Sequence, residues 1–228
     1  MKNGEFVDYD KQREGKDQIK ELTEVIDQGK ADAQIYFGRG SYYHSKGEWD
    51  KAIADYNKAL ESPYPSPAVY EMRGVAYMEK GNLEKAIEDL TSSVHAMCCQ
   101  PNQLMNIADA HLRHGDFDKT IEYTKLLLQM KADFPGANFF IAEAYKGKGD
   151  FQNAISLMTQ AITQKPDEGQ NYIIRADAYF VKQDLEKCWQ DVEKAKSLGF
   201  KINEDHKKSL WIYLNHQFRE EMKKRLEK

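Results

Sequence analysis

The sequence predicts an all-α protein built as an α-solenoid, and two regular features of the chain lead to this fold class. A bulky apolar residue recurs every 34 residues, at Trp49, Leu83, Phe117, Phe151 and Leu185. A glycine stands two residues before each of the first four, at Gly47, Gly81, Gly115 and Gly149. A period of this length is typical of stacked helix pairs. Such arrays present extended binding surfaces, so the pattern favours a binding protein over an enzyme.

The period divides the chain into five repeats, residues 33–66, 67–100, 101–134, 135–168 and 169–202. The fourth and eleventh places are mostly aromatic, as at Tyr36 and Tyr43. The eighth place is always small: Gly40, Gly74, Ala108, Ala142 and Ala176. Residues three and four apart share one face of a helix, so these places form a single stripe. Small residues there allow two helices to approach closely, while the large rings fill the volume beside them.

The turn inside each repeat also has a recurring composition. The glycine at the fifteenth place suits a left-handed cap that ends the first helix. A short acidic or amide residue follows it and suits the start of the second helix: Glu48, Asn82, Asp116, Asp150 and Asp184. Prolines at three repeat starts suit the first turn of a helix: Pro67, Pro101 and Pro135. Each repeat is therefore expected to form two antiparallel helices that must stack to bury their stripes.

This pattern resembles that of the tetratricopeptide repeat family, which has an aromatic, Leu-Gly, Tyr, Ala, an aromatic, Ala and Pro in order. The first repeat matches it nearly throughout from Tyr36 to Leu60, and the resemblance covers about residues 33–202. It implies a right-handed superhelix whose first helices line a concave groove. Arg39, Arg73 and Arg175 depart from the pattern, because they stand where the family has Leu.

The two ends of the chain are expected to be capping helices. Residues 1–32 are interpreted as an N-terminal cap and residues 203–228 as a C-terminal cap, which repeat arrays need for solubility. The C-terminal segment carries an apolar stripe spaced three and four apart, with Trp211, Leu214 and Phe218. An alternative role for this stripe is to dock a partner or a second copy of the chain.

The resemblance also indicates which residues would face the groove, because particular places of the first helices project there. The candidates are Phe37, Met72, Met105, Asn106, Asp109, Phe139, Phe140, Glu143, Ile173, Ile174 and Asp177. The family's clamp of Lys, Asn and Arg for a carboxyl terminus is absent from these places. Asp109, Glu143 and Asp177 share the ninth place and are expected to form an acidic line among apolar side chains. This predicts a protein or peptide partner that alternates basic and apolar residues, the alternative being a solvated face.

Composition narrows the function further. A net charge of −4 argues against general nucleic-acid binding, and no run of 18 apolar residues exists that could insert in a membrane. The three cysteines, Cys98, Cys99 and Cys188, do not suggest a disulfide framework, which favours the cytoplasm. An exported form is the alternative if a leader precedes this segment.

No sequence motif indicates catalysis: a phosphate-binding loop, a nucleophile elbow and a paired-cysteine metal motif are all missing. His111 and His114, with Asp109 nearby, are interpreted as core and turn residues, so no metal or cofactor is expected. The sequence therefore predicts a non-enzymatic adaptor, a monomer or weak homodimer, that binds a peptide or protein segment in its groove. The alternative is an assembly subunit that oligomerises through the C-terminal helix or the convex face.

Overall fold

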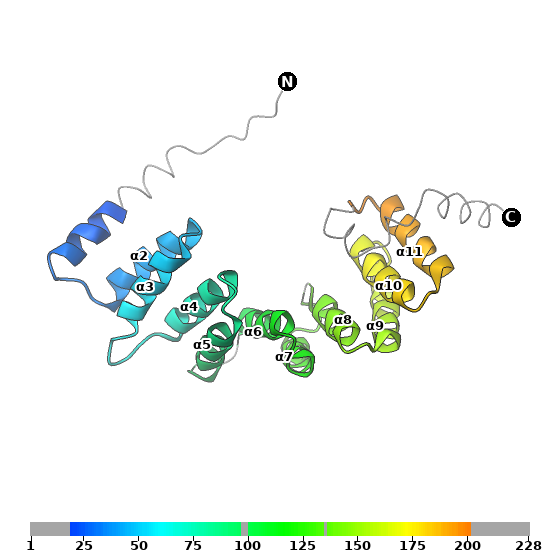
Figure 1. Cartoon of the computed structure of the whole chain (residues 1–228), viewed down its shortest axis with the longest axis horizontal. Coiled ribbons are helices and arrows are strands. Elements are labelled where there is room, and N and C mark those ends of the chain that lie inside the picture. Colours follow the sequence, from blue (N-terminus) through cyan, green and yellow to red (C-terminus); the bar gives the residue numbers. More distant parts are fainter. Residues whose placement is uncertain (1–18, 97–99, 135, 202–228) are drawn as a thin grey trace, which may run out of the picture. The chain divides into compact units, whose positions relative to one another are not determined.

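The helices follow one another in antiparallel pairs, and the described residues contain no strand (Figure 1). The computed structural model describes residues 19–96, 100–134 and 136–201. The chain divides into two compact units, Met1–His114 and Gly115–Lys228, which are described separately below. Residues 19–27 are helical, and α2 (Ala33–Ser45), α3 (Trp49–Ala59), α4 (Pro67–Glu79), α5 (Leu83–Ala96) and α6 (Pro101–His114) complete the first unit. The second unit holds α7 (Phe117–Met130), α8 (Ala137–Gly147), α9 (Phe151–Gln164), α10 (Gly169–Val181) and α11 (Leu185–Ser197).

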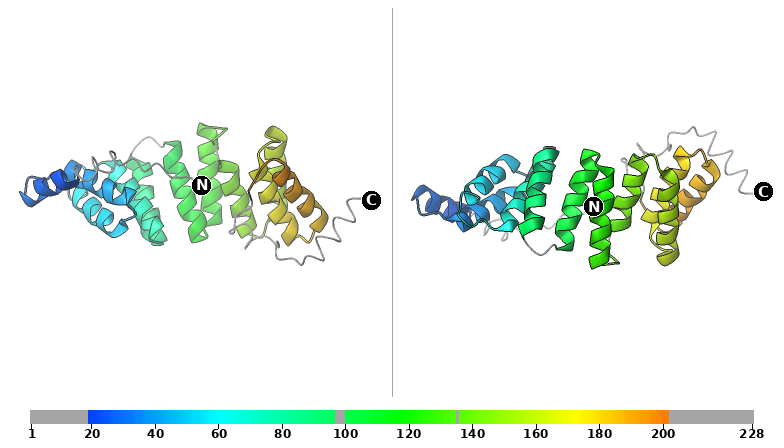
Figure 2. Two further views of the ribbon diagram at one scale, coloured as in Figure 1. Left: turned by 90° about the horizontal axis from the view of Figure 1, so that it is seen from above. Right: turned by 90° about the horizontal axis from the view of Figure 1, so that it is seen from below.

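Within each unit the helices pack against their neighbours in sequence, and first helices also pack against the next first helix. In the first unit α2 contacts α3 and α4, and α4 also contacts α5 and α6. In the second unit α8 contacts α9 and α10, and α10 contacts α11 (Figure 2). The contacts between α2 and α4, α4 and α6, and α8 and α10 join first helices of successive repeats. No helix in the described part of the chain is long and apolar enough to cross a membrane.

The turn between the two helices of a repeat takes the left-handed conformation expected for it. The glycines have φ values of +72° at Gly47, +78° at Gly81, +93° at Gly115 and +75° at Gly149. In the fifth repeat the same place is occupied by Gln183, which adopts φ +61° despite its Cβ atom. The following residue caps the second helix at Asp150 and Asp184, whose carboxylates accept from the backbone N–H three residues on. Glu48 does not cap in this way and instead pairs with Lys51.

Close helix contact explains the small residue at the eighth place. A Cβ atom on Gly40 would lie 2.8 Å from the Tyr56 ring. One on Gly74 would lie 2.9 Å from Leu90 and 3.2 Å from the carbonyl oxygen of Ala86, which is backbone and cannot move aside. These distances are below ordinary van der Waals contact, so the first two repeats require glycine where their helices cross, whereas alanine fits at this place in the other three.

Apolar clusters hold each helix pair together and extend into the next repeat. In the first repeat Ala52, Tyr56 and Ala59 are fully buried, and Val69 of the second repeat joins their cluster. In the fifth repeat Cys188 is buried with Trp189 and Val192 against the first helix, as expected for a small core place. Burial of apolar surface at these clusters is the main force that stacks the repeats.

The three arginines that depart from the family pattern make a recurring ion pair. Arg39, Arg73 and Arg175 each bind an aspartate 16 residues later through two hydrogen bonds of 2.7–2.8 Å, to Asp55, Asp89 and Asp191. The aspartates are buried, and their hydrogen bonds raise the pKa of each arginine above its ordinary value. Each arginine also donates to a residue 16 positions earlier, at Thr23, Asn57 and Thr159. The pair therefore joins the two helices of its repeat to the helix before it.

Candidate protein-binding surface

In the second unit the first helices α8 and α10 present a mixed apolar and charged surface. Phe139 and Phe140 lie edge to face, with ring centroids 5.5 Å apart and an angle of 87°. Phe139 packs partly against a cluster that contains Met158 and Ile174, whereas Phe140 is partly exposed and has no place in that cluster. Both rings are partly exposed, and Phe140 is the one that does not pack against this cluster.

The carboxylates of Glu143 and Asp177 are bridged by an ammonium group. The Lys146 Nζ lies 2.8 Å from Glu143 and 3.0 Å from Asp177, and its side chain is 17% exposed. Burial disfavours the charged ammonium, yet the charges of Asp177 and Glu143 outweigh it and raise the pKa of Lys146. Lys146 thus neutralises one of two negative charges at this point of the surface.

A similar arrangement lies on α6 of the first unit. Arg113 Nη2 lies 2.9 Å from Asp109, and its Nη1 lies 3.5 Å from Glu79 of α4. Burial disfavours the charged guanidinium, but Asp109 and Glu79 prevail and raise the pKa of Arg113. The expected acidic line is therefore interrupted by cations at the twelfth and thirteenth places of the first helices, which the sequence reading did not weigh. Alignment of Asp109 with the other two acids crosses between units and stays a prediction.

Other groove candidates turn out to be interior or bonded within the protein. Ile173 is 0% exposed and belongs to the core, so the expectation that it lines an open groove is corrected. Ile174 is 4% exposed and borders the cavity described below. Phe37 and Met72 are partly buried against the cluster of the first repeat. Met105 is partly buried on α6.

Asn106 is engaged by the preceding repeat. Its amide donates to Glu71 at 3.1 Å, and Gln103 donates to the other carboxylate oxygen at 3.3 Å. Gln103 also donates to Ser93 at 3.0 Å. The fifth-place carboxylate of the second repeat thus fills the space between α4 and α6 with a hydrogen-bonded network.

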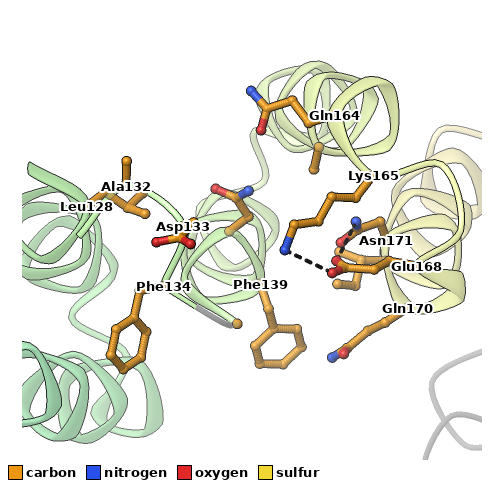
Figure 3. A pocket seen from close by; sticks show the side chains of 14 residues that line it. Leu128, Ala132, Asp133, Phe134, Phe139, Gln164, Lys165, Glu168, Gln170 and Asn171 are labelled. Carbon is orange, nitrogen blue, oxygen red and sulfur yellow. Dashed lines mark hydrogen bonds and ion pairs between the residues drawn. The ribbon is translucent and has the colours of Figure 1, made fainter.

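A cavity of about 440 Å³ opens between α8 and α10 near the loops that precede them. We call it the repeat-four cleft. Figure 3 shows the rings of Phe134 and Phe139 pointing in the same direction, and Lys165 and Asn171 reaching Glu168 on the other side. Lys165 pairs with Glu168 at 3.1 Å, and Asn171 donates to it at 3.2 Å. The remaining lining residues are Leu128, Ala132, Asp133, Gly136, Asn138, Ala161, Gln164, Gln170 and Ile174.

A second cavity, the repeat-one cleft of about 700 Å³, lies at the corresponding position of the first unit. Phe37 occupies the same fifth place as Phe139, and Tyr64, which is 93% exposed, stands on the loop beside it. Asp32 contributes a carboxylate, and the remaining lining residues are Ala33, Gln34, Ser62, Ser66 and Val69. The sequence reading missed both clefts, because their loop residues vary between repeats.

The other candidates give no further site. Trp211, Leu214 and Phe218, and likewise Cys98 and Cys99, lie outside the described residues. His111 is buried, and His114 lies 3.7 Å from Glu84. Within the described ranges no three His, Cys, Asp or Glu side chains are placed to hold a metal ion.

Paired helices, left-handed glycine turns and contacts between successive first helices define a helical repeat protein. Family models described as tetratricopeptide repeat match residues 33–61, 67–94 and 135–168. The chain is a tetratricopeptide repeat protein, as its sequence pattern indicates. No curated protein matches the sequence.

Solved structures of repeat proteins share this fold. A tetratricopeptide repeat protein from Cytophaga hutchinsonii, of which the C-terminal part was solved, is 18% identical, with a TM-score of 0.69 over 82% of this chain and 75% of that one. The MamA protein is 22% identical, with a TM-score of 0.65 over 75% of this chain and 93% of that one. YrrB, described as a repeat protein with an unusual peptide-binding site, is 20% identical, with a TM-score of 0.63 over 78% and 91%. At these identities the similarity concerns the fold.

Proposed function

We propose that the protein is a non-enzymatic adaptor that binds an extended peptide segment across its first helices. The single observation that carries this proposal is the partly exposed Phe139–Phe140 pair on α8, beside an open cavity. Aromatic residues are enriched among the side chains that dominate binding energy at interfaces. Tetratricopeptide repeat proteins generally mediate protein–protein interactions, and YrrB is described as having a peptide-binding site. We place the adaptor in the cytoplasm, because its three cysteines do not suggest a disulfide framework.

The charges of the surface favour a partner with basic and apolar side chains. In the second unit two carboxylates, Glu143 and Asp177, flank one ammonium, Lys146, so this cluster of ion pairs holds more acids than bases. In the first unit Asp109 and Glu79 face Arg113, with the same balance. The excess of acidic over basic side chains is small, so the affinity for a basic peptide should fall only modestly as the salt concentration rises.

Panning of a random peptide library on the purified chain tests the proposal. Selected peptides would carry a fluorescent label, and anisotropy would give their affinities for the parent chain and for the Phe139→Ser and Phe140→Ser variants. We expect a loss of ~1–3 kcal/mol for at least Phe140→Ser if that ring anchors the peptide.

The matched control is Leu126→Ser, which removes a large apolar side chain that is 40% exposed on the second helix α7. It should leave peptide affinity unchanged. Peptides that bind both phenylalanine variants normally and lose affinity only for Leu126→Ser would contradict binding on the first helices.

The assembly alternative is favoured by one observation, the exposure of Leu126 and Met130 four residues apart on α7. Light scattering would separate the two functions. A stable dimer of the parent chain that dissociates in Leu126→Ser would support assembly through the second-helix face.

A further inference from the structure

The two clefts have a similar composition. Each combines two aromatic rings with an aspartate: Phe134, Phe139 and Asp133 in the repeat-four cleft, and Phe37, Tyr64 and Asp32 in the repeat-one cleft. Phe139 and Phe37 occupy the same place of their repeats, whereas the second ring comes from different loops: Phe134 from the loop before α8, and Tyr64 from the loop between α3 and α4. The two clefts, which lie in different units, thus offer the same chemistry.

The residue at the fifth place differs in the second repeat. In the second repeat this place holds Glu71, which accepts hydrogen bonds from Gln103 and Asn106 of the following first helix. The corresponding space is therefore occupied by the protein's own polar groups. A phenylalanine cannot make these hydrogen bonds. The fifth place is phenylalanine in the first repeat (Phe37) and in the fourth (Phe139), and a cavity is open beside each of them.

The aspartates of the two clefts have carboxylate oxygens that can still accept hydrogen bonds. Asp133 is exposed and forms no ion pair with any described residue, while Lys165 in the same cleft already pairs with Glu168. Asp32 caps α2 through Oδ1 alone, which accepts from the N–H groups of Gln34 and Ile35 at 2.9 and 3.0 Å. Each cleft accordingly has one carboxylate that forms no ion pair with a described residue. In the repeat-four cleft a cation is already present, because Lys131 Nζ lies 5.7 Å from the centroid of the Phe134 ring.

The protein itself shows what an aromatic ring and an aspartate bind together. Arg175 lies 5.8 Å from the Tyr172 ring centroid and 5.9 Å from that of Tyr179 while it binds Asp191. Arg39 is held in the same way by Tyr43 and Asp55. A guanidinium group is planar and weakly hydrated, so it stacks on rings and pairs with a carboxylate at once.

We propose that each cleft accepts an arginine side chain of the partner segment, with the aliphatic stem on the phenylalanine and the guanidinium at the aspartate. This inference rests on the proposed peptide-binding function and names the side chain that the adaptor selects. It adds Asp133 and Asp32 as sites of basic specificity to the cluster of Glu143, Lys146 and Asp177.

Fluorine NMR on the full chain labelled with 4-fluorophenylalanine tests the proposal directly. The probe is the blocked tripeptide acetyl-Gly-Arg-Gly-amide, and its controls replace Arg with citrulline, which keeps the shape without the charge, or with norleucine. The resonances of Phe37, Phe134 and Phe139 would be assigned by single Phe→Tyr substitutions.

We expect saturable shifts at all three rings with the arginine peptide, and binding at least about threefold weaker with citrulline or norleucine. Asp133→Asn should weaken binding about threefold at Phe134 and Phe139 and leave Phe37 unchanged. Asp133 is exposed, so the variant should fold normally, which circular dichroism would verify.

Equal responses to the arginine and citrulline peptides would overturn the proposal, and so would absence of saturable shifts at either cleft. A stronger response to norleucine would assign the clefts to apolar side chains and also overturn it. Failure here with intact, Phe140-dependent binding of library-selected peptides would leave the adaptor function standing. Failure of both would remove the function itself.

Discussion

The fourth repeat has an apolar pair where the fifth repeat has the Arg175–Asp191 ion pair. Substituting that apolar pair should show how much the intact ion pair adds to the free energy of unfolding, whereas substituting Arg175 alone should show the cost of leaving Asp191 without its partner. Repeat four carries Ile141 and Leu157 where repeat five carries Arg175 and Asp191. The perturbations are therefore Arg175→Ile, Asp191→Leu and the double variant. These substitutions use a combination that the chain already accommodates.

The structure sets the expected magnitudes. Asp191 is 5% exposed, and Arg175 donates to its two oxygens at 2.8 and 2.7 Å. Breaking a buried pair by removing one partner costs about 3–5 kcal/mol, whereas replacing both by apolar residues is often neutral. We expect Arg175→Ile to lose about 3 kcal/mol or more and the double variant to lose less than about 1 kcal/mol.

The assay is guanidinium unfolding followed by circular dichroism, with hydrogen exchange of α10 and α11 to assign the loss to the fifth repeat. The cost of Arg175→Ile should also depend on pH. Burial raises the pKa of Asp191, and Arg175 opposes this shift. Without Arg175 the buried acid prefers to be protonated, so the variant should lose stability as pH rises through the raised folded-state pKa. A double variant as unstable as Arg175→Ile, or single variants without measurable cost, would refute this reasoning.

Two further predictions concern single residues. Burial lowers the pKa of His44, which lies edge-on to Trp49, against the smaller influence of Glu79. The unfolded chain therefore binds more protons than the folded chain, and stability should fall as pH drops below about 6.5. The melting temperature of His44→Gln should depend less on pH than that of the parent chain. An equal pH dependence in both would show that His44 does not cause the loss of stability. Gln183→Gly should stabilise the fifth repeat by about 1 kcal/mol, because φ +61° is strained for a residue with a Cβ atom; an unchanged or lower unfolding midpoint would show that the Gln183 side chain compensates.

The sequence was sufficient to predict the features that recur along the repeats. Small residues at the eighth place, such as Gly40 and Gly74, predicted close helix contact, and the Cβ distances confirm it. The turn glycines predicted left-handed caps, and their φ values confirm these as well. Such features depend on neighbours at fixed separations along one chain, so a periodic pattern carries them.

Interactions between different places of the repeat were harder to predict. The Arg–Asp pairs could have been predicted from the sequence. Wherever the seventh place is Arg, the residue 16 positions later is Asp, and in the other two repeats the residues at these two places are apolar or aromatic. The neutralising roles of Lys146 and Arg113 depend on side-chain reach rather than on place. The burial of Ile173 and Ile174 depends on how closely α10 packs against its neighbours, which position in the repeat does not encode.

The Arg–Asp pairs also constrain how such a chain can be lengthened or rearranged in evolution. Because Arg175 binds Asp191 in its own repeat and Thr159 in the one before, half a repeat cannot be exchanged between an ion-paired and an apolar copy without stranding a buried charge. A duplication that copies the whole period keeps the partners together. The shortest duplication that keeps the Arg–Asp pair intact is therefore one complete 34-residue repeat. Keeping the hydrogen bond to Thr159 as well requires the second helix of the preceding repeat.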